Sequence, residues 1–256
     1  MGTNTPRAPL NQSVISSELS QYWRVSVVEL TTSTQDDLLR NLALGNAKNG
    51  DVVVAEFQSA GRGRLDRKFD AAHSSALLFS FYLQPKREKK DWGFLTLLAG
   101  MAVTRALNSA VQANYPVMLK WPNDLLIGDL KVGGIIASLQ SEGVVIGVGV
   151  NVEMDQSQLP VPTATSLLLA GSSELDRNTL LVKILNEIEQ VFTSWDNGEI
   201  YVDRYREMSA TLGKVVQITL PNGQSIQSRA LDVDASGALS LENGDRITVG
   251  DVIHLR

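Results

Sequence analysis

The chain has 256 residues, a mass of 27.8 kDa and a formal net charge of −5. This length suits one large domain, or one large and one small domain. The acidic balance argues against a protein that wraps nucleic acid with bulk positive charge. Because cysteine is absent, the chain has no disulfide framework, thiolate zinc site, iron–sulfur cluster or cysteine nucleophile. Its only imidazoles are His73 and His254, so a two-histidine metal site is not expected.

The N-terminal segment, residues 1–15, is polar and contains Pro6 and Pro9. We expect it to be a disordered tail, and it lacks the apolar core of a secretory signal. No run of about 18 apolar residues occurs in the chain, so no membrane segment is predicted. The protein is therefore expected in the cytoplasm. The absence of cysteine is compatible with this location but also with others.

The first half of the chain alternates strand-like and helix-like segments. Ser33 or Thr34 can cap a helix that stops at Gly45, with acidic residues in its first turn. Residues 95–111 are rich in Leu, Ala and Met with few polar positions, which predicts a largely buried helix. Strands are predicted at Arg24–Leu30, Asp51–Phe57 and Ser75–Leu83.

The second half begins with short apolar segments joined by very short links. Such links cannot make a parallel crossover, so the segments are predicted to form an antiparallel meander. Apolar residues at helical spacing between Leu181 and Trp195 then predict an amphipathic helix capped by Asn178, followed by a second helix. The meander strands are expected at residues 117–121, 124–127, 134–140 and 144–152.

From residue 213 the pattern changes to short strands at turn spacing, which is typical of a small SH3-like barrel. We predict an α+β fold with a mixed, mainly antiparallel sheet, helices on one side of that sheet, and a C-terminal SH3-like β-barrel. The expected division is a tail at 1–15, a main domain at 16–211 and the barrel at 212–256.

A basic, glycine-rich loop follows the second predicted strand. Gly61 and Gly63 let the backbone approach a ligand closely, and their N–H groups together with neighbouring cations can make an anion site. The loop does not match a P-loop, and a solvated basic loop or an RNA-binding patch are alternatives. Four cations and Asp66 give it a local charge of +3, the cations being Arg62, Arg64, Arg67 and Lys68.

A second polar stretch, Lys120-Trp121-Pro122-Asn123-Asp124, is followed by Lys131 and Gly134. By itself this stretch is compatible with a rigid turn in which Asn123 and Asp124 bond their own backbone. Lys131, placed after a hairpin turn, is equally compatible with an exposed lysine.

Together the two stretches resemble biotin protein ligases, which read Gln-x-x-Gly-Arg-Gly-Arg, then Lys-Trp-Pro-Asn-Asp, then Lys-x-x-Gly in this order. The resemblance covers roughly residues 20–256 and is that of a short form without an N-terminal DNA-binding domain. It implies that residues 16–211 form a biotin/lipoate ligase-type domain with a class II aminoacyl-tRNA-synthetase-like core. Further matches are Ser33-Thr34-Gln35, Gly147-Val148-Gly149-Val150-Asn151-Val152 and Ala164-Thr165-Ser166-Leu167.

Three positions depart from the family pattern. Asp66 stands where the family usually has a glycine, and Phe69 replaces a tryptophan. Ser138 stands where a glutamate is often found. The aromatic ring of Phe69 can still cover a ligand, whereas Asp66 puts in doubt the detailed closure of the loop over phosphate.

The resemblance implies ATP-dependent biotinylation of a lysine on a biotin carboxyl carrier protein, via biotinyl-5′-AMP. It assigns catalysis to Lys131, Arg64 and Asp124. It assigns biotin binding to Ser33, Thr34, Gln35, Gln58, Gly61, Arg62, Gly63, Arg64, Lys131 and Gly134. It assigns ATP and adenylate binding to Arg62, Gly63, Arg64, Arg67, Phe69, Asn123, Lys131 and Asn151.

The ligands implied are biotin and ATP, with Mg²⁺ accompanying the ATP and no metal site made by the protein alone. The macromolecular partner is the carrier domain of a carboxylase, neither DNA nor a membrane is expected to bind, and a homodimer is possible. Two alternatives stay open. A lipoate ligase or octanoyltransferase shares the fold but takes a long apolar chain without a ureido ring, and a basic-loop nucleic-acid-binding protein would bind in a salt-sensitive way.

Overall fold

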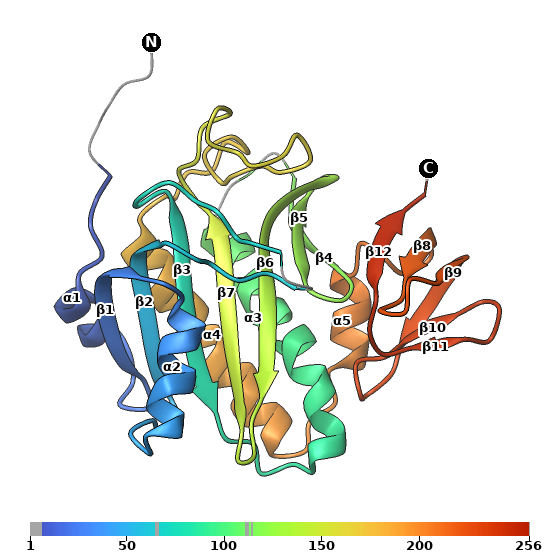
Figure 1. Ribbon diagram of the computed structural model, residues 1–256, viewed down its shortest axis with the longest axis horizontal. Helices are drawn as coiled ribbons and strands as arrows, with labels where there is room; N and C mark the ends of the chain where they lie inside the picture. Colours follow the sequence, from blue (N-terminus) through green and yellow to red (C-terminus); the bar gives the residue numbers. More distant parts are fainter. Residues whose placement is uncertain (1–6, 65–66, 111–112, 114, 256) are drawn as a thin grey trace.

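A computed structural model describes residues 7–64, 67–110, 113 and 115–255. Its centre is a seven-stranded sheet (Figure 1). The first two strands pair in parallel and all other neighbours are antiparallel, which makes the sheet mixed and mainly antiparallel, as predicted. In sheet order the strands are β1 Arg24–Thr31, β2 Asp51–Gln58, β3 Ala76–Leu83, β7 Val144–Asn151, β6 Leu130–Leu139, β5 Asp124–Ile127 and β4 Val117–Lys120.

Strands β4 to β7 form the predicted antiparallel meander. The turn between β5 and β6 needs only Gly128 and Asp129, and Gly128 has a φ of 59°, a conformation that glycine adopts without strain. Such a short connection forces neighbouring strands to run in opposite directions. Residues of β5 and β6 that bear on the site therefore lie side by side, with Asp124 opposite Gly134.

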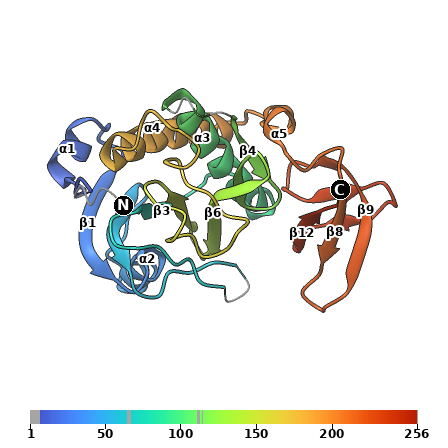
Figure 2. The same cartoon turned by 90° about the horizontal axis from the view of Figure 1, so that it is seen from above.

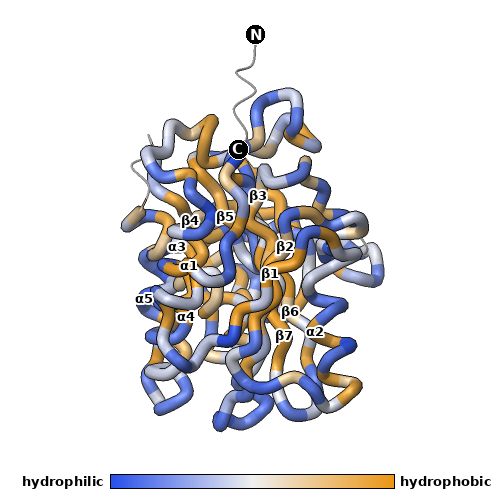
Figure 3. Tube along the Cα trace, turned by 90° about the vertical axis from the view of Figure 1, so that its left-hand side faces the viewer, coloured by the Kyte–Doolittle hydropathy of each residue, from blue (hydrophilic) through white to orange (hydrophobic). Residues whose placement is uncertain are grey.

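Helices cover both faces of the sheet, which corrects the prediction that they lie on one side. The α3 helix (Leu95–Ala110) and α4 (Arg177–Asp196) pack together on one face, and α2 (Thr34–Ala43) lies on the other (Figures 1 and 2). The apolar face of α2 places Leu38 against Val53, Tyr82 and Val145. Because both faces are covered, β3 and β7 are buried at every position, and the apolar part of the chain trace gathers in the sheet (Figure 3).

The N-terminal segment is folded from residue 7 onward, so the disorder predicted for residues 1–15 is wrong for residues 7–15. A short helix, α1 (Gln12–Ser17), is capped by the side chain of Asn11, and Leu10 is buried. Residues 1–6 lie outside the described part of the chain. Polarity and prolines predicted a tail, whereas contacts with distant residues order the segment.

Those contacts centre on a buried ion pair in which Arg177 Nη1 lies 2.7 Å from Glu56 Oε2. Glu56 accepts a hydrogen bond from the backbone N–H of Leu10, and Arg177 donates to the carbonyl of Ala8. Hydrogen bonds to the carboxylate outweigh its burial and lower the pKa of Glu56. The pair therefore fastens the N-terminal segment to β2 and α4.

The cap of α4 also differs from the prediction. Asp176, not Asn178, is the N-cap, and its carboxylate accepts from the N–H groups of Asn178 and Thr179. Asn178 instead bonds the N-terminal segment, since its Oδ1 accepts from Asn11 N at 2.7 Å. The helix begins two residues earlier than its apolar spacing suggested.

The C-terminal part is a separate five-stranded antiparallel sheet in the order β11-β10-β9-β8-β12, as predicted for an SH3-like module. It packs closely on the main domain through the 3-10 helix η1 (Lys89–Phe94), where a Cβ on Gly93 would lie 2.4 Å from Ser236 O. The boundary at residue 212 stays a prediction and falls between α5 and β8. The remaining elements are α5 Val202–Met208, β8 Val215–Thr219, β9 Ser225–Val233, β10 Leu239–Leu241, β11 Arg246–Ile247 and β12 Asp251–His254.

In the described residues, no helix is both long enough and apolar enough to cross a membrane.

Candidate active site

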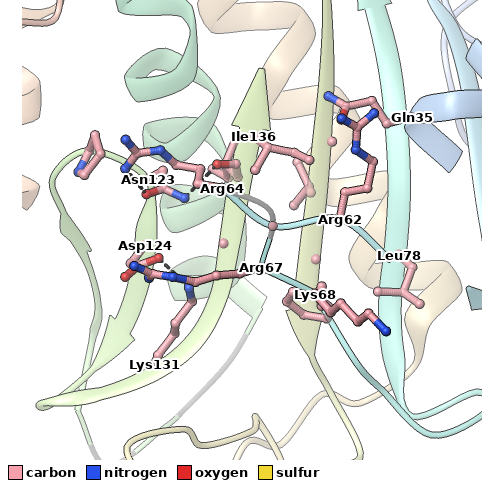
Figure 4. Close-up of a pocket in the computed structure, with 18 of the residues that line it drawn as sticks. Gln35, Arg62, Arg64, Arg67, Lys68, Leu78, Asn123, Asp124, Lys131 and Ile136 are labelled. Atoms are coloured by element: carbon pink, nitrogen blue, oxygen red, sulfur yellow. Dashed lines mark hydrogen bonds and ion pairs between the residues drawn. The ribbon is translucent and has the colours of Figure 1, made fainter. Parts of the chain in front are cut away.

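A cavity of about 500 Å³ opens between α2, the ends of β2 and β3, and strands β6 and β7. It is lined by most of the residues that the sequence predicted for the site, several of which are labelled in Figure 4. Residues far apart in the chain thus meet in one place. The predicted residues at the cavity are Ser33, Thr34, Gln35, Gln58, Arg62, Gly63, Arg64, Arg67, Phe69, Asn123, Asp124, Lys131 and Gly134.

One end of the cavity is polar, and the side chains of Ser33, Thr34, Gln58 and Ser80 that line it carry no formal charge. Gln58 Oε1 accepts hydrogen bonds from the backbone N and the hydroxyl of Thr34, at 2.8 and 3.0 Å. The same hydroxyl lies 2.8 Å from Ser80 Oγ. Ser33 is the N-cap residue of α2, but its side chain makes no capping bond, so Gln58 satisfies the helix end in its place. Ser80 was not predicted, although its place on β3 puts it beside Thr34.

The middle of the cavity is apolar, and its floor is formed by glycines, which have no side chain. Gly147 and Gly149 of β7 leave space in front of the sheet, and Leu78 and Ile136 line its sides. A Cβ on Gly149 would lie 2.8 Å from ring carbons of Phe69. The ring of Phe69 therefore covers this glycine and closes one side of the cavity.

The glycine-rich loop forms a small antiparallel hairpin. Gly63 N donates to Arg67 O at 2.7 Å and Phe69 N donates to Gly61 O at 2.9 Å. A Cβ on Gly61 would lie 2.3 Å from Phe69 O, so Gly61 permits this close pairing and does not itself line the cavity. Asp66, the clearest departure from the family pattern, lies outside the described residues together with Leu65.

The hairpin delivers arginines to the opposite, cationic end. Arg64 Nη1 donates to Asn123 Oδ1 at 3.1 Å and to Gly250 O at 3.2 Å, the first of these bonds being drawn in Figure 4. Burial lowers the pKa of the Arg64 guanidinium, an effect that Asp124 opposes. Arg67 forms an ion pair with Asp251 of the C-terminal sheet.

Two lysines flank one carboxylate at this end. Lys131 Nζ lies 2.6 Å from Asp124 Oδ1, and Lys120 Nζ lies 4.0 Å from Asp124 Oδ2. Burial lowers the pKa of the Lys120 ammonium; Asp124 counteracts this shift and the positive charge of Lys131 adds to it. Positive charge is therefore concentrated and held in place where an anion would be bound.

The family model that matches residues 27–155 of the chain is described as the biotin/lipoate A/B protein ligase family. The chain belongs to this family. Among curated members, it is 36% identical to the biotin–[acetyl-CoA-carboxylase] ligase of Mycobacterium tuberculosis over 98% of this chain and 97% of that protein. It is 32% identical to the bifunctional ligase/repressor BirA of Bacillus subtilis over 86% of this chain and 69% of that protein.

A solved structure of the same family has a similar fold. Biotin protein ligase from Aquifex aeolicus, in complex with biotin and ATP, superimposes with a TM-score of 0.76 and 27% identity. The match covers 91% of this chain and 99% of the other. Both parts of the chain thus have counterparts in a structure of this ligase family.

Asn151 does not reach the cavity, although the family resemblance assigned it to ATP. It is buried, and its Nδ2 donates to Thr165 O at 2.9 Å. Thr165 N in turn donates to Lys131 O at 2.8 Å. Asn151 therefore supports the backbone segment that carries Lys131 instead of contacting the cavity.

Sequence reasoning missed the contribution of the C-terminal sheet to the ligase cavity. Asp251, Val252 and Ile253 of β12 line it, together with Thr219 of β8. No local pattern distinguishes Asp251 from other strand-edge carboxylates, so only the packing of the two parts reveals it. Lys120 could have been found, since it begins the Lys-Trp-Pro-Asn-Asp stretch.

Proposed function

We propose that this protein is an ATP-dependent biotin protein ligase, which activates biotin as biotinyl-5′-AMP and transfers the biotinyl group to a lysine of a biotin carboxyl carrier domain. The observation that carries the proposal is one cavity with an uncharged hydrogen-bonding end, an apolar middle and a cationic end. Biotin has the same sequence of properties, from ureido ring through apolar rings and chain to carboxylate. The family relationship supports the same function, because one relative is named a biotin–[acetyl-CoA-carboxylase] ligase and the related structure contains biotin and ATP.

The uncharged end suits the ureido group. Ser33, Thr34 and Gln58 offer both donors and acceptors, and a buried site built to bond such a group rejects ligands that lack it. The apolar middle, closed by Phe69, would hold the fused rings and the alkyl chain. This arrangement places the biotin carboxylate beside Lys131 and Arg64.

In the first reaction a carboxylate oxygen of biotin attacks the α-phosphorus of ATP, the bond to the bridging oxygen breaks, and pyrophosphate leaves. Lys131 and Arg64 stabilise the negative charge that builds on the phosphoryl oxygens, since fixed cations act strongly in a site that excludes water. Asn123 orients Arg64 and Asp124 orients Lys131. Arg67 and Lys120 would contact the outer phosphates.

In the second reaction the ε-amine of the acceptor lysine attacks the acyl carbon of biotinyl-5′-AMP. An amide bond forms, the acyl–phosphate bond breaks, AMP leaves, and the amine loses a proton. Of the two carboxylates at this end of the cavity, Asp251 pairs with Arg67, and Asp124 would receive the proton or orient the amine. No enzyme nucleophile is needed, in keeping with a chain without cysteine.

Mg²⁺ is expected to accompany ATP, where it neutralises phosphate charge. Throughout the described residues no group of three or more His, Cys, Asp or Glu side chains could form a metal cage. An ion held mainly by phosphates and water needs few protein ligands, and Asp124 and Asp251 are carboxylates that line the cavity. Consumption of ATP is also in keeping with the cytoplasmic location expected from the sequence, and a homodimer stays a prediction.

The alternatives fit the cavity less well. A lipoyl or octanoyl chain would offer no hydrogen-bond partner to the buried Ser33 hydroxyl or to Gln58 Nε2 at this end of the cavity. In a nucleic-acid-binding protein the basic side chains of the loop would all face outward, whereas the side chain of Arg64 is only 20% exposed and bonds Asn123 within the cavity wall.

Incubation with ATP, Mg²⁺ and biotin, followed by mass detection of biotinyl-5′-AMP, tests the proposal directly. Calorimetry with biotin and with lipoate should give saturable binding for biotin alone. Absence of the adenylate, or tighter binding of lipoate, would overturn the proposal.

A further inference from the structure

The segment 121–124, which is the turn between β4 and β5 together with the first residue of β5, holds the side chains of the cationic end of the cavity in place. Its Asn123 accepts from Arg64, and its Asp124 pairs with Lys131. Both side chains that face the phosphates thus depend on the position of this one turn. Any group that fixes the turn also fixes the distance between Arg64 and Lys131.

The outer side of the turn is fixed by residues from beyond position 208. The backbone N–H of Trp121 donates to Thr211 Oγ1 at 3.0 Å, and its indole Nε1 donates to Gly237 O at 3.0 Å. Trp121 and Thr211 are both fully buried. The turn therefore rests on the C-terminal part of the chain, not only on its own strands.

Thr211 connects the turn to His254. Its Oγ1 lies 3.1 Å from His254 Nε2. The hydroxyl oxygen accepts from Trp121, and its own proton can bond Nε2 of an imidazole that is protonated on Nδ1. Burial, reinforced by Lys214 and Lys120, lowers the pKa of His254 to about 4, so this neutral form persists at pH 7.

We infer that Thr211 and His254 are a positioning pair, through which the C-terminal sheet holds the Trp121–Asp124 turn in register with the arginine hairpin. Strand β12 carries His254 at one end and Asp251, the partner of Arg67, at the other. The same strand thus contacts the arginine hairpin through Asp251 and the Trp121–Asp124 segment, by way of Thr211, through His254. The catalytic consequence of this inference rests on the proposed function.

The inference predicts a selective defect. Thr34 and Gln58, at the uncharged end, bond each other and β3 without involving the C-terminal sheet. Loss of the positioning pair should therefore impair the use of ATP and leave biotin binding in place.

The test compares Thr211→Val, which keeps the shape and removes the hydroxyl, with Thr211→Ser, which restores it. In adenylate synthesis at saturating biotin, Thr211→Val should lower kcat/KM for ATP by about tenfold to a hundredfold, the usual effect of a small misplacement. Its Kd for biotin without ATP should change by less than about twofold. Thr211→Ser should retain most activity, and His254→Gln, which can still accept a bond, should lie between them.

The matched control is Thr193→Val, the same change at an exposed position of α4, which should leave every parameter unchanged. Assays run well below each variant's Tm separate positioning from loss of fold. Equal losses in ATP use and biotin affinity, or wild-type kinetics in Thr211→Val, would overturn the inference. If Thr211→Val does not fold, the comparison of Thr211→Ser with His254→Gln decides it by the same criteria.

Hydrogen exchange gives a readout that is independent of the reaction. The amides of Trp121, Asn123 and Asp124 should exchange faster in Thr211→Val and in His254→Phe than in the wild type, with the helix α2 amides unchanged. If the wild type forms no biotinyl-5′-AMP, the proposed function fails, and the exchange data still decide whether the coupling exists. Unchanged exchange in the turn would refute the coupling.

Discussion

Asp124 Oδ1 lies 2.6 Å from Lys131 Nζ, across the neighbouring antiparallel strands β5 and β6. The Lys131 side chain is 42% exposed, so this ion pair contributes little to stability. Its consequence is positional, since the carboxylate holds an ammonium group at the mouth of a cavity that an anion can enter.

Lys131→Ala should slow adenylate synthesis by about 10²–10³-fold, the usual cost of removing one group that stabilises developing charge. Its Tm should stay within about 2 °C of the wild type, because an exposed pair is worth less than about 1 kcal/mol. Rates of pyrophosphate exchange and a thermal melt measure the two effects. Near-normal exchange would remove Lys131 from the reaction.

Arg64→Ala should speed dissociation of biotinyl-5′-AMP by about 10–100-fold, because a charged hydrogen bond contributes about 1.5–3 kcal/mol. A chase with unlabelled biotin gives the dissociation rate. Arg40→Ala is the matched control, since Arg40 lies on the exposed side of α2 and pairs only with Asp37 among the described residues. A similar rate in both variants would mean that Arg64 does not retain the adenylate.

Gly149→Ala should weaken biotin binding, because the added Cβ would meet the Phe69 ring at 2.8 Å. Overpacking of this kind costs about 1–3 kcal/mol, so Kd by calorimetry should rise by about 5–150-fold. In a Phe69→Ala background the same substitution should have little further effect, because the clash is gone. Additive effects of the two substitutions would show that the ring does not close the cavity.

Glu56→Gln should lower the free energy of unfolding by about 3–5 kcal/mol, since it leaves the buried Arg177 without its counterion. Protection of the N-terminal segment should be lost at the same time, because the Leu10 amide bonds this carboxylate. Arg24→Ala, at the exposed pair with Asp51, should cost less than about 1 kcal/mol. Chemical denaturation measures the free energy of unfolding of both variants. Equal losses of that free energy would show that burial does not raise the cost of breaking an ion pair.

Stability should fall as the pH drops from about 6.5 to about 4. His254 has a folded-state pKa of about 4 and an unfolded value near 6.5, so the unfolded chain binds more protons in this window and gains stability from acid. The groups that face it are Lys214, Lys120 and Asp129. The full shift corresponds to about 3 kcal/mol, which half exposure of the imidazole reduces to about 1–2 kcal/mol.

Chemical denaturation at a series of pH values checks this expectation, with His254→Gln as the variant in which this contribution to the slope should disappear. An unchanged slope in that variant would assign the acid sensitivity between pH 6.5 and 4 to groups other than His254.

The sequence by itself determined the features that depend on near neighbours. Short links fixed the antiparallel meander of β4 to β7, and the apolar composition of residues 95–110 predicted α3. The polar stretches at 58–69 and 120–134 were predicted to form one site from their resemblance to biotin protein ligases, and in the structure residues of both line one cavity. The strand and helix predictions rest on backbone geometry within about twenty residues, whereas the site was predicted from the family resemblance of two separate stretches.

Only the tertiary structure decided which distant side chains meet. The Glu56–Arg177 pair orders a segment whose composition predicts disorder, Asn151 turns to Thr165 instead of the cavity, and Gly61 serves the pairing of a hairpin. Asp251 reaches the cavity, and His254 reaches the Thr211 hydroxyl behind it, because the C-terminal sheet packs against the β4–β5 turn. These contacts form because the fold brings residues that are distant in the sequence next to each other. Local hydrophobic periodicity predicts helices and strands, but it carries no information about which distant residues meet.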